Sequence, residues 1–227
     1  LNSISFDNTN FMAGLGEGEY TFTVVDQENC SWDTTFTVYD PPALTLELGN
    51  DIMLQLGEDT TISAQYNIPD SLIHSLIWAP MEMLGCRDTL SDICTEVLAF
   101  PLTSLRVSAT LTDNNGCSVR EEILLQINKD RLVFIPNIFT PNGDTQNDVF
   151  TIFASEGVEK INRFFVYDRW GEIVYESYDF QPNDPAFGWD GKLKGSPLNP
   201  AVFVYWAEVK LLDGQSVVYS GDVTLMR

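Results

Sequence analysis

Apolar and polar side chains alternate with a period of two along most of this chain. Two such runs, Tyr20 to Val25 and Thr34 to Tyr39, flank a polar loop and predict a β-hairpin. After the break at Pro41-Pro42, similar runs recur at intervals of roughly 10–15 residues, with Gly, Asp, Asn or Pro between them. This rhythm is typical of an antiparallel, immunoglobulin-like sandwich.

From about residue 130 the predicted strands are longer. The segment 161–177 indicates two strands joined at residues 168–171, where Gly171 can adopt a positive φ. A second hairpin turns at Asp213-Gly214. One face of each of its strands is apolar, so the hairpin is expected to cover a core. The residues of these faces are Phe203, Tyr205, Ala207, Val209 and Leu211, then Val217, Tyr219, Val223 and Leu225.

No window carries a sustained apolar stripe of helical period, so no long helix is expected. The fold class is therefore predicted to be all-β, a series of antiparallel, immunoglobulin-like β-sandwiches with domains at 1–42, 43–129 and 130–227. Segments 18–38 and 105–127 share one plan, a strand, an Asp-led turn with Asn and then Cys, and a strand, which indicates related modules in series. Residues 1–42 are too few to fold alone and are expected to dock on their neighbour or to be part of a larger module.

The chain is strongly acidic, with 12 Lys+Arg against 33 Asp+Glu and a formal net charge of −21. This balance excludes nucleic acid and anionic membranes as partners, since phosphate binding needs basic patches. No apolar run approaches the ~20 residues that span a bilayer, so membrane insertion is not expected. The first ten residues lack the pattern of a signal peptide, so any export leader is expected to have been removed or to lie upstream.

Charge also changes along the sequence. Residues 1–129 hold 19 acids and 4 bases, whereas residues 130–227 hold 14 acids and 8 bases. The shift coincides with the expected domain boundary near residue 130.

The four cysteines fit an exported protein. Cys86 and Cys94 lie in one polar loop, where a separation of eight residues closes easily, so a local disulfide is predicted. Cys30 and Cys117 occupy equivalent turns of different modules and need not meet. Zinc is a weak alternative, because the chain has no CxxC motif and only one histidine, His74.

Catalysis is not expected. His74 stands at the start of a predicted strand without a nucleophile motif near it, and no Gly-rich phosphate loop precedes a Lys-Ser/Thr pair. The acidic residues offer many carboxylate pairs, but none stands out by its spacing.

Two binding hypotheses remain open. Asn142, Asp144, Asn147 and Asp148 place oxygen atoms in one loop, which suits calcium but equally suits a tight turn. The second hypothesis concerns six aromatic side chains. They form a platform for a glycan if they are exposed, and they only pack in the core of the sandwich if they are buried. The rings concerned are Trp170, Trp189, Trp206, Tyr175, Tyr178 and Phe187.

Four blocks of sequence, in order, give residues 134–227 a specific resemblance. They are PNIFTPNGD (136–144) with Asn147-Asp148 and Phe150, then FVYDRWG (165–171), GWDG (188–191) and GDVTLMR (221–227). This part resembles the type B sorting domain of the type IX secretion system of Bacteroidetes, also called the gliding motility-associated C-terminal domain. The sequence departs from that pattern at Thr145, where the family often has Gly, at Asp168, and at Pro200–Phe203.

The preceding residues resemble the modules found before such domains. Segment 14–42 is similar to the end of a repeat of large gliding adhesins, and segment 46–118 is similar to their PKD-like or immunoglobulin-like domains. Gln55 stands where family members often have a further Cys, which leaves Cys117 without an obvious partner.

The resemblance implies a non-catalytic region of a secreted or cell-surface protein. Its last ~95 residues would be the signal for export by the type IX outer-membrane translocon, with its shuttle and attachment components, after folding in the periplasm. The residues implied as the sorting signal are Gly221, Asp222, Val223, Thr224, Leu225 and Arg227. An extended strand there can be read by β-augmentation, or it can simply complete the sandwich. The alternative function is an adhesin or carbohydrate-binding module with a glycan or surface partner.

Overall fold

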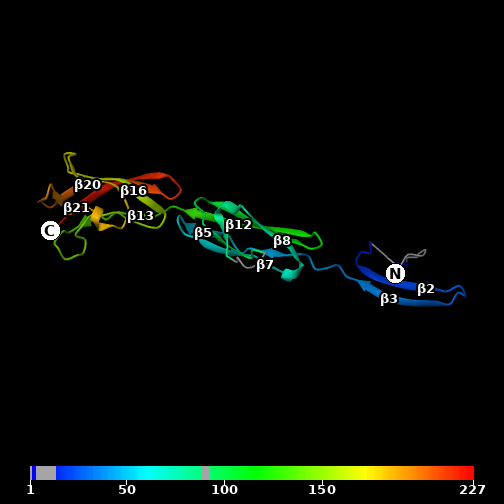
Figure 1. The fold of residues 1–227 in the computed structure, drawn as a ribbon. Coiled ribbons are helices and arrows are strands. Elements are labelled where there is room, and N and C mark those ends of the chain that lie inside the picture. Colours follow the sequence, from blue (N-terminus) through cyan, green and yellow to red (C-terminus); the bar gives the residue numbers. More distant parts are fainter. Residues whose placement is uncertain (1, 4–13, 88–92) are drawn as a thin grey trace. The chain divides into compact units, whose positions relative to one another are not determined.

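The computed structural model describes residues 2–3, 14–87 and 93–227. These residues form strands and three short 3₁₀ turns, with no α-helix among them (Figure 1). The all-β prediction is therefore confirmed. No helix in the described part is long and apolar enough to cross a membrane. The chain divides into two compact units, Leu1–Leu44 and Thr45–Arg227.

The first unit is built on one hairpin. It consists of β2 (Gly18–Val25) and β3 (Ser31–Val38), with β1 (Asn2–Ser3) paired parallel to β2. Tyr20 is its one buried hydrophobic residue among those described and stacks on Phe36 with ring centroids 5.8 Å apart. Most other apolar side chains are exposed, including Trp32 at 62%. The unit thus has little core of its own, and its docking on a neighbour stays a prediction.

The second unit begins with a sandwich. One sheet has the order β5-β12-β11-β8, a second has β6-β10-β9, and β4 pairs with β7. The strands are β4 (Leu46–Glu47), β5 (Ile52–Gln55), β6 (Thr60–Ser63), β7 (Gln65–Tyr66), β8 (Ile73–Ala79), β9 (Leu84–Cys86), β10 (Glu96–Ala99), β11 (Leu105–Asp113) and β12 (Ser118–Asn128), with 3₁₀ turns at Asp70–Leu72 and Met81–Met83.

Trp78 of the edge strand β8 is buried in the core of this sandwich. Its side chain is 3% exposed and its Nε1 donates a hydrogen bond to the Cys94 carbonyl at 2.8 Å. Cys94 forms a disulfide with Cys86 across a Cα–Cα distance of 5.8 Å. The hydrogen bond from Trp78 and the disulfide together hold Cys86 and Cys94, the two ends of one loop. Residues 88–92 of this loop lie outside the described part.

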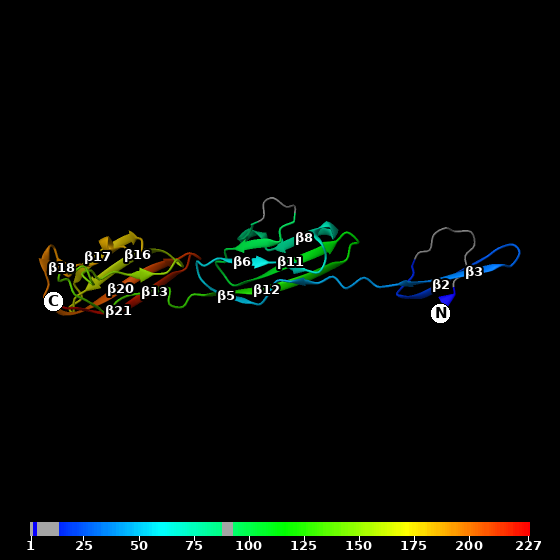
Figure 2. The same ribbon diagram turned by 90° about the horizontal axis from the view of Figure 1, so that it is seen from below.

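The rest of the second unit, residues 130–227, is here called the third module. Its five-stranded sheet has the order β14-β21-β20-β16-β17, and β13-β15 and β18-β19 form two separate two-stranded sheets. Figure 2 shows this module with β16, β17, β20 and β21 of the larger sheet labelled. The strands are β13 (Val133–Phe134), β14 (Ile138–Phe139), β15 (Phe153–Ala154), β16 (Val158–Tyr167), β17 (Ile173–Phe180), β18 (Lys192–Leu193), β19 (Ser196–Pro197), β20 (Ala201–Leu211) and β21 (Ser216–Leu225), with a 3₁₀ turn at Pro185–Phe187.

The sheets are not purely antiparallel. β5 pairs parallel with β12, and β14 pairs parallel with β21. Both parallel partners are short, two to four residues. The sequence pattern predicts alternation but not direction, because a strand of this length carries the same period in either orientation.

One turn recurs in all three modules. An Asp accepts, through Oδ1, the backbone N–H groups two and four residues later, at 2.8–2.9 Å. The residue three positions on has a positive φ, which Gly and Asn tolerate best. The three sets are Asp26 with Asn29, Asp113 with Gly116, and Asp168 with Gly171. The similarity between segments 18–38 and 105–127 thus reflects a shared type of hairpin turn. The cysteines in these turns, Cys30 and Cys117, are free and exposed.

The sandwich and the third module share packed residues. Leu56 of the sandwich, 1% exposed, is part of the hydrophobic core of the third module. Lys129 pairs with Asp213 and also donates to Gln215 Oε1 at 3.2 Å. The hydrogen bond from Lys129 is the main cause that lowers the pKa of the Asp213 carboxyl. Gly157 lies directly against the Leu56 backbone.

Gly157→Ala is expected to destabilise residues 45–227. The added Cβ would lie 2.5 Å from the Leu56 carbonyl oxygen, a backbone atom that cannot turn aside. Such overpacking costs about 1–3 kcal/mol. Urea unfolding of the variant measures the loss, with Gly85→Ala as the control because its Cβ would meet nothing closer than 4.0 Å. Equal midpoints for both variants would contradict the close approach.

Candidate functional site: the core and surfaces of the third module

Trp189 organises the third module. It is completely buried, and its indole Nε1 donates to the Lys192 carbonyl at 2.9 Å. Its ring centroid lies 5.2 Å from that of Phe139 and 4.8 Å from that of Phe203. Its backbone exchanges two hydrogen bonds of 2.9 Å with Phe150. The tryptophan therefore holds the loop layer onto the sheet through both side chain and backbone.

The two glycines around Trp189 are needed for close approach. A Cβ on Gly188 would lie 2.2 Å from Val149 Cγ1 and 2.9 Å from the Phe150 carbonyl oxygen. Gly191 has φ +74°, and its Cβ would lie 3.0 Å from Leu225 Cδ1. The Gly-Trp-Asp-Gly block is thus explained by packing and backbone conformation.

The loop 140–148 is held by its own polar side chains. Asp148 accepts the N–H of Gly143 through one oxygen and that of Thr145 through the other, both at 2.7 Å. Asn142 donates to Asp144, and this bond is the main cause that lowers the pKa of the Asp144 carboxyl. These contacts are what the turn hypothesis requires. Calcium at Asn142, Asp144, Asn147 and Asp148 stays a prediction.

The predicted sorting residues are divided between core and surface. Val223 and Leu225 are fully buried, and the Thr224 N–H donates to the Asn137 carbonyl at 2.8 Å. Arg227 Nε donates to the Leu198 carbonyl at 3.2 Å, and Asp222 is exposed. Much of this segment therefore serves the fold, and only part of it is available to a partner.

Gly221 makes room for a tyrosine. A Cβ there would lie 2.8 Å from the Tyr205 hydroxyl oxygen. Burial raises the pKa of Tyr205, with a smaller contribution from the charge of Asp222. The ring also contacts Phe150, with centroids 5.6 Å apart, so the glycine and the core are linked.

The end of β21 is not a free sheet edge. β14 covers it, through the pairs Ile138↔Thr224 and Phe139↔Leu225. At Thr224 and Leu225 the strand is therefore paired on both sides, as the sandwich-completion alternative requires, and recognition of residues 222–227 by β-augmentation stays a prediction. The unpaired edge lies further upstream in β21, because β14 supplies only two residues.

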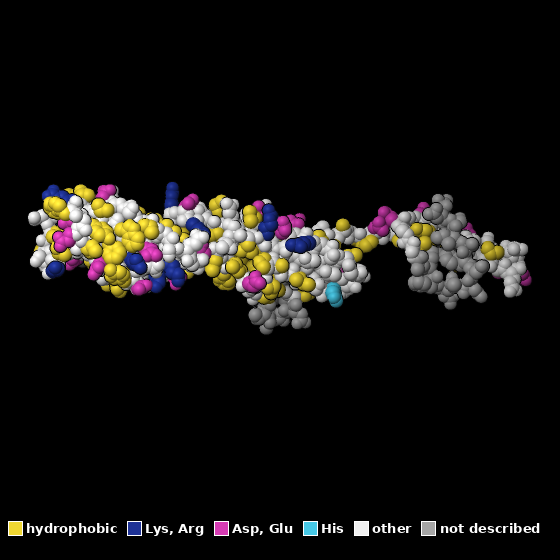
Figure 3. Space-filling model, turned by 90° about the horizontal axis from the view of Figure 1, so that it is seen from above, with side chains coloured by type: hydrophobic (Ala, Val, Ile, Leu, Met, Phe, Trp, Pro, Cys, Tyr) yellow, Lys and Arg dark blue, Asp and Glu magenta, His cyan; other side chains and the backbone are white. Residues whose placement is uncertain are grey.

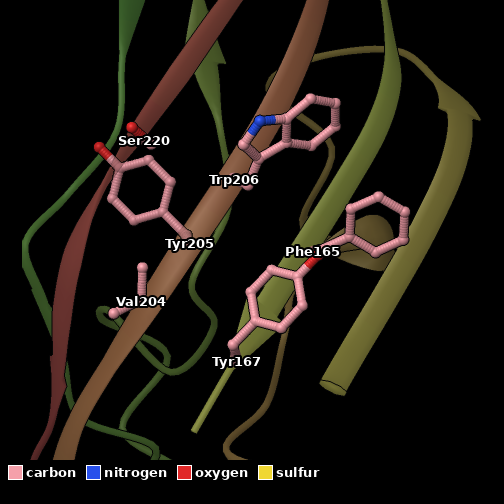
Figure 4. A pocket seen from close by; sticks show the side chains of 6 residues that line it. All are labelled: Phe165, Tyr167, Val204, Tyr205, Trp206 and Ser220. Atoms are coloured by element: carbon pink, nitrogen blue, oxygen red, sulfur yellow. The ribbon is translucent and has the colours of Figure 1, made fainter. Parts of the chain in front are cut away.

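Aromatic side chains gather on the outer face of the five-stranded sheet. Phe165 of β16 lies opposite Trp206 of β20, with ring centroids 5.8 Å apart, and meets Tyr178 edge-on at 5.5 Å. Phe165, Trp206, Tyr167 and Val204 line an open depression of about 410 Å³ together with Tyr205 and Ser220 (Figure 4). Figure 3 views this side of the module and shows hydrophobic side chains exposed there.

The aromatic residues predicted from sequence do not form one platform. Trp189 is in the core, while Trp170 is 74% exposed in the turn after β16 and stacks under the Arg169 guanidinium. Of the six rings, Trp206 and Tyr178 lie on the outer face around Phe165. Of the two alternatives left open from the sequence, core packing does not describe Trp206, which is half-buried on that face.

Sequence reasoning missed Phe165 and Tyr167 as surface residues. They alternate with Phe164 and Val166, which are fully buried, so both faces of β16 are apolar. A two-sided apolar run is typical of a buried strand and hides which face is covered. His74 lies exposed in β8, and no metal-binding cluster of His, Cys, Asp or Glu occurs among the described residues.

Comparison with known proteins supports one assignment. Residues 133–225 match the family model of the CHU_C type IX secretion signal domain. No curated protein matches the chain. Among solved structures, the chain is 12% identical to SGBP-B of the Bacteroides ovatus mixed-linkage glucan utilisation locus, covering 93% of this chain and 54% of that one at a TM-score of 0.29.

Two further structures are similarly distant. Dimeric latent PorU from Porphyromonas gingivalis is 11% identical over 92% of this chain and 24% of its own, with a TM-score of 0.29. The insect immune protein hemolin is 8% identical over 92% of this chain and 56% of its own, with a TM-score of 0.34. The chain thus spans about half the length, or less, of these structures.

The family match assigns a role to the third module. Residues 133–225 form a type IX secretion signal domain, here called the sorting domain. This domain serves as a signal for export to the cell surface or the medium, and it interacts with the type IX secretion machinery. Three of the sequence blocks lie wholly in it and the fourth extends two residues beyond it. Each block contributes a buried side chain: Phe139, Val166, Trp189 and Leu225.

Thr145→Gly is expected to stabilise the sorting domain. Thr145 has φ +70°, where a β-branched side chain is strained by about 1–2 kcal/mol and Gly is not. Gly also makes the unfolded chain more flexible, which offsets part of this relief. The free energy of unfolding, measured in urea, is therefore expected to rise by about 0.5–1 kcal/mol.

The neighbouring Gln146→Gly is the matched control. Gln146 is exposed in the same loop and is not among the residues with positive φ. The free energy of unfolding of Gln146→Gly should fall by about 0.5–1 kcal/mol, because Gly at this position only adds conformational freedom to the unfolded chain. The same sign of change for both variants would contradict the assigned backbone conformation.

Proposed function

We propose that the export machinery reads the folded surface of residues 133–225 after folding in the periplasm, and not a linear peptide. The observation that carries this is the burial of the sequence blocks. Trp189, Val223 and Leu225 are each completely buried, so no partner can touch them in the folded domain. Their part in the signal is to build the surface that is recognised.

We further propose that the direct partners are the outer-membrane translocon and its shuttle or attachment components. The residues before the sorting domain act as non-catalytic spacer or adhesin-type modules, of immunoglobulin or PKD type at 43–129 and of repeat type at 1–42. The recurring Asp-led turn supports modules of related construction. A role in gliding motility follows from the resemblance of both parts.

A transport assay tests the folded signal. A signal peptide and fluorescent reporter are joined to residues 130–227 or to the compact unit 45–227, in a bacterium with the type IX machinery. Reporter at the surface or in the medium, lost in a translocon-deficient strain, is the expected result. The longer fusion is expected to export better, since Leu56 completes the core of the sorting domain.

Periplasmic retention of both fusions, with the sorting domain shown to be folded, would contradict the proposal. The longer fusion guards against a trivial failure, because it keeps every buried residue of the core together. If the shorter fusion is exported as efficiently as the longer one, the sandwich adds nothing to the signal.

Deletion of Gly221–Arg227 is expected to abolish export while the sandwich stays folded. Since the deletion also removes Val223 and Leu225 from the core, Asp222→Ala combined with Arg227→Ala serves as a companion that changes two exposed side chains, with loss of the Arg227 hydrogen bond to the Leu198 carbonyl. Loss of export in the companion, at an unchanged unfolding midpoint, assigns direct recognition to these two side chains. Normal export of the deletion would contradict the proposal.

A further inference from the structure

β21 carries a row of backbone groups that face outward without a strand beside them. The Leu211 N–H donates to Gln215 across the β20–β21 turn, and the Thr224 N–H donates to Asn137 on the opposite side, both at 2.8 Å. β20 and β21 pair through ten consecutive residues without a register shift. The backbone N–H and C=O groups of odd-numbered residues of β21 therefore point toward β20, and those of even-numbered residues point to the other side of the strand. The N–H and C=O groups of Ser216, Val218 and Ser220 therefore point away from β20, along the open edge of the sheet.

No backbone or side-chain acceptor for these N–H groups is present among residues 2–3, 14–87 and 93–227. The neighbouring β14 reaches only Thr224 and Leu225. The side chains of Ser216, Val218 and Ser220 are all exposed. A stretch of about five residues, roughly 17 Å at 3.3 Å per residue, is thus open along the edge.

The opposite edge of the sheet is protected. β17 carries Glu176 and Asp179, Asp179 has φ +50° and is paired with Lys160, and a register shift interrupts its ladder with β16. Charges, twisted residues and bulges are the usual means by which sheet edges avoid further pairing. The open stretch of β21 has none of these, and the first charge, Asp222, stands beyond it.

We propose that an extended segment of a type IX machinery component adds to the sheet along Ser216–Ser220 as a further β-strand. This inference rests on the proposed function and names the surface by which the folded signal is bound. Main-chain hydrogen bonds to Val218 and Ser220 supply the affinity, and alternate side chains supply the selectivity.

The surroundings define the chemistry of the incoming strand. On the outer face it lies beside Val218, which is 54% exposed, and beside Ser220, whose cross-strand neighbour is Trp206. On the other face it meets Val217 and Tyr219, which are half-buried at the margin of the core. Asp222 follows at one end, and the chain carries a net charge of −21. The complementary strand is therefore apolar on both faces and basic at the end that reaches Asp222.

Proline substitution separates the backbone edge from the side chains. Ser220→Pro in the full chain removes one outward N–H that the fold does not use, which an edge strand tolerates. Export is expected to fall at least tenfold, while Ser220→Ala, which keeps the N–H, exports like the unsubstituted chain. Val218→Pro is the second variant, in case Ser220→Pro does not fold, and unfolding midpoints are measured for all three.

Amide hydrogen exchange checks the geometry in the free protein. The N–H groups of Val218 and Ser220 should exchange rapidly, while those of Val217, Tyr219 and Val223 should be protected by β20. Protection of the even-numbered amides would overturn the proposal, since the edge would already be covered. A dimer that Ser220→Pro dissolves would likewise overturn it, because the occupant would be a second copy of this chain.

The outcomes distinguish this inference from the proposed function. If the unsubstituted chain is not exported in a translocon-dependent manner, the proposed function fails. If the unsubstituted chain and folded Ser220→Pro are exported equally, the edge is not the binding surface, and the folded signal stands. Loss of export in Ser220→Pro alone, with folding and amide exchange as expected, supports strand addition.

Discussion

The buried contact between Trp189 and its aromatic neighbours is the interaction on which the sorting domain depends. Residues 186–200 have few strand partners of their own, and β18 and β19 are only two residues each. Trp189 joins this loop to Phe139 on one side and Phe203 on the other, while its backbone pairs with Phe150. Gly188 and Gly191 allow this approach. Without the tryptophan, residues 186–200 would lose their buried contacts with Phe139 and Phe203.

Under the proposed function, this arrangement lets a signal be specific in sequence and yet be read as a surface. Residues far apart in the chain, among them Phe139, Val166 and Leu225, are buried in one core and cannot contact a partner. A partner can contact only the surface that this core supports. That surface includes the aromatic outer face around Phe165 and Trp206 and the edge of β21.

Much of the fold could be predicted from period-two alternation and turn residues. The apolar faces of β20 and β21 and the turns at Gly171 and Gly214 are confirmed, because alternation and a positive φ are local properties. Strand direction and edges could not be predicted. The pairing of β14 with Thr224 joins residues 86 positions apart in sequence, and local patterns carry no record of such neighbours. For the same reason the outer aromatic face was hidden, since Phe164 and Phe165 are equally apolar but only one is buried.

The most direct test of the folded address compares export with the stability of core variants from three separate blocks. Phe139→Leu, Trp189→Phe and Leu225→Ala each alter a fully buried side chain and leave the exposed surface unchanged. Costs of about 2–5 kcal/mol are expected for Leu→Ala, with smaller costs for the milder changes. Surface export of the full chain is measured beside the folded fraction. Our account predicts that all three variants fall on one line, on which export follows the folded fraction. Export that survives unfolding, or that is lost only for Leu225→Ala at equal folded fraction, would contradict it and point to a linear signal.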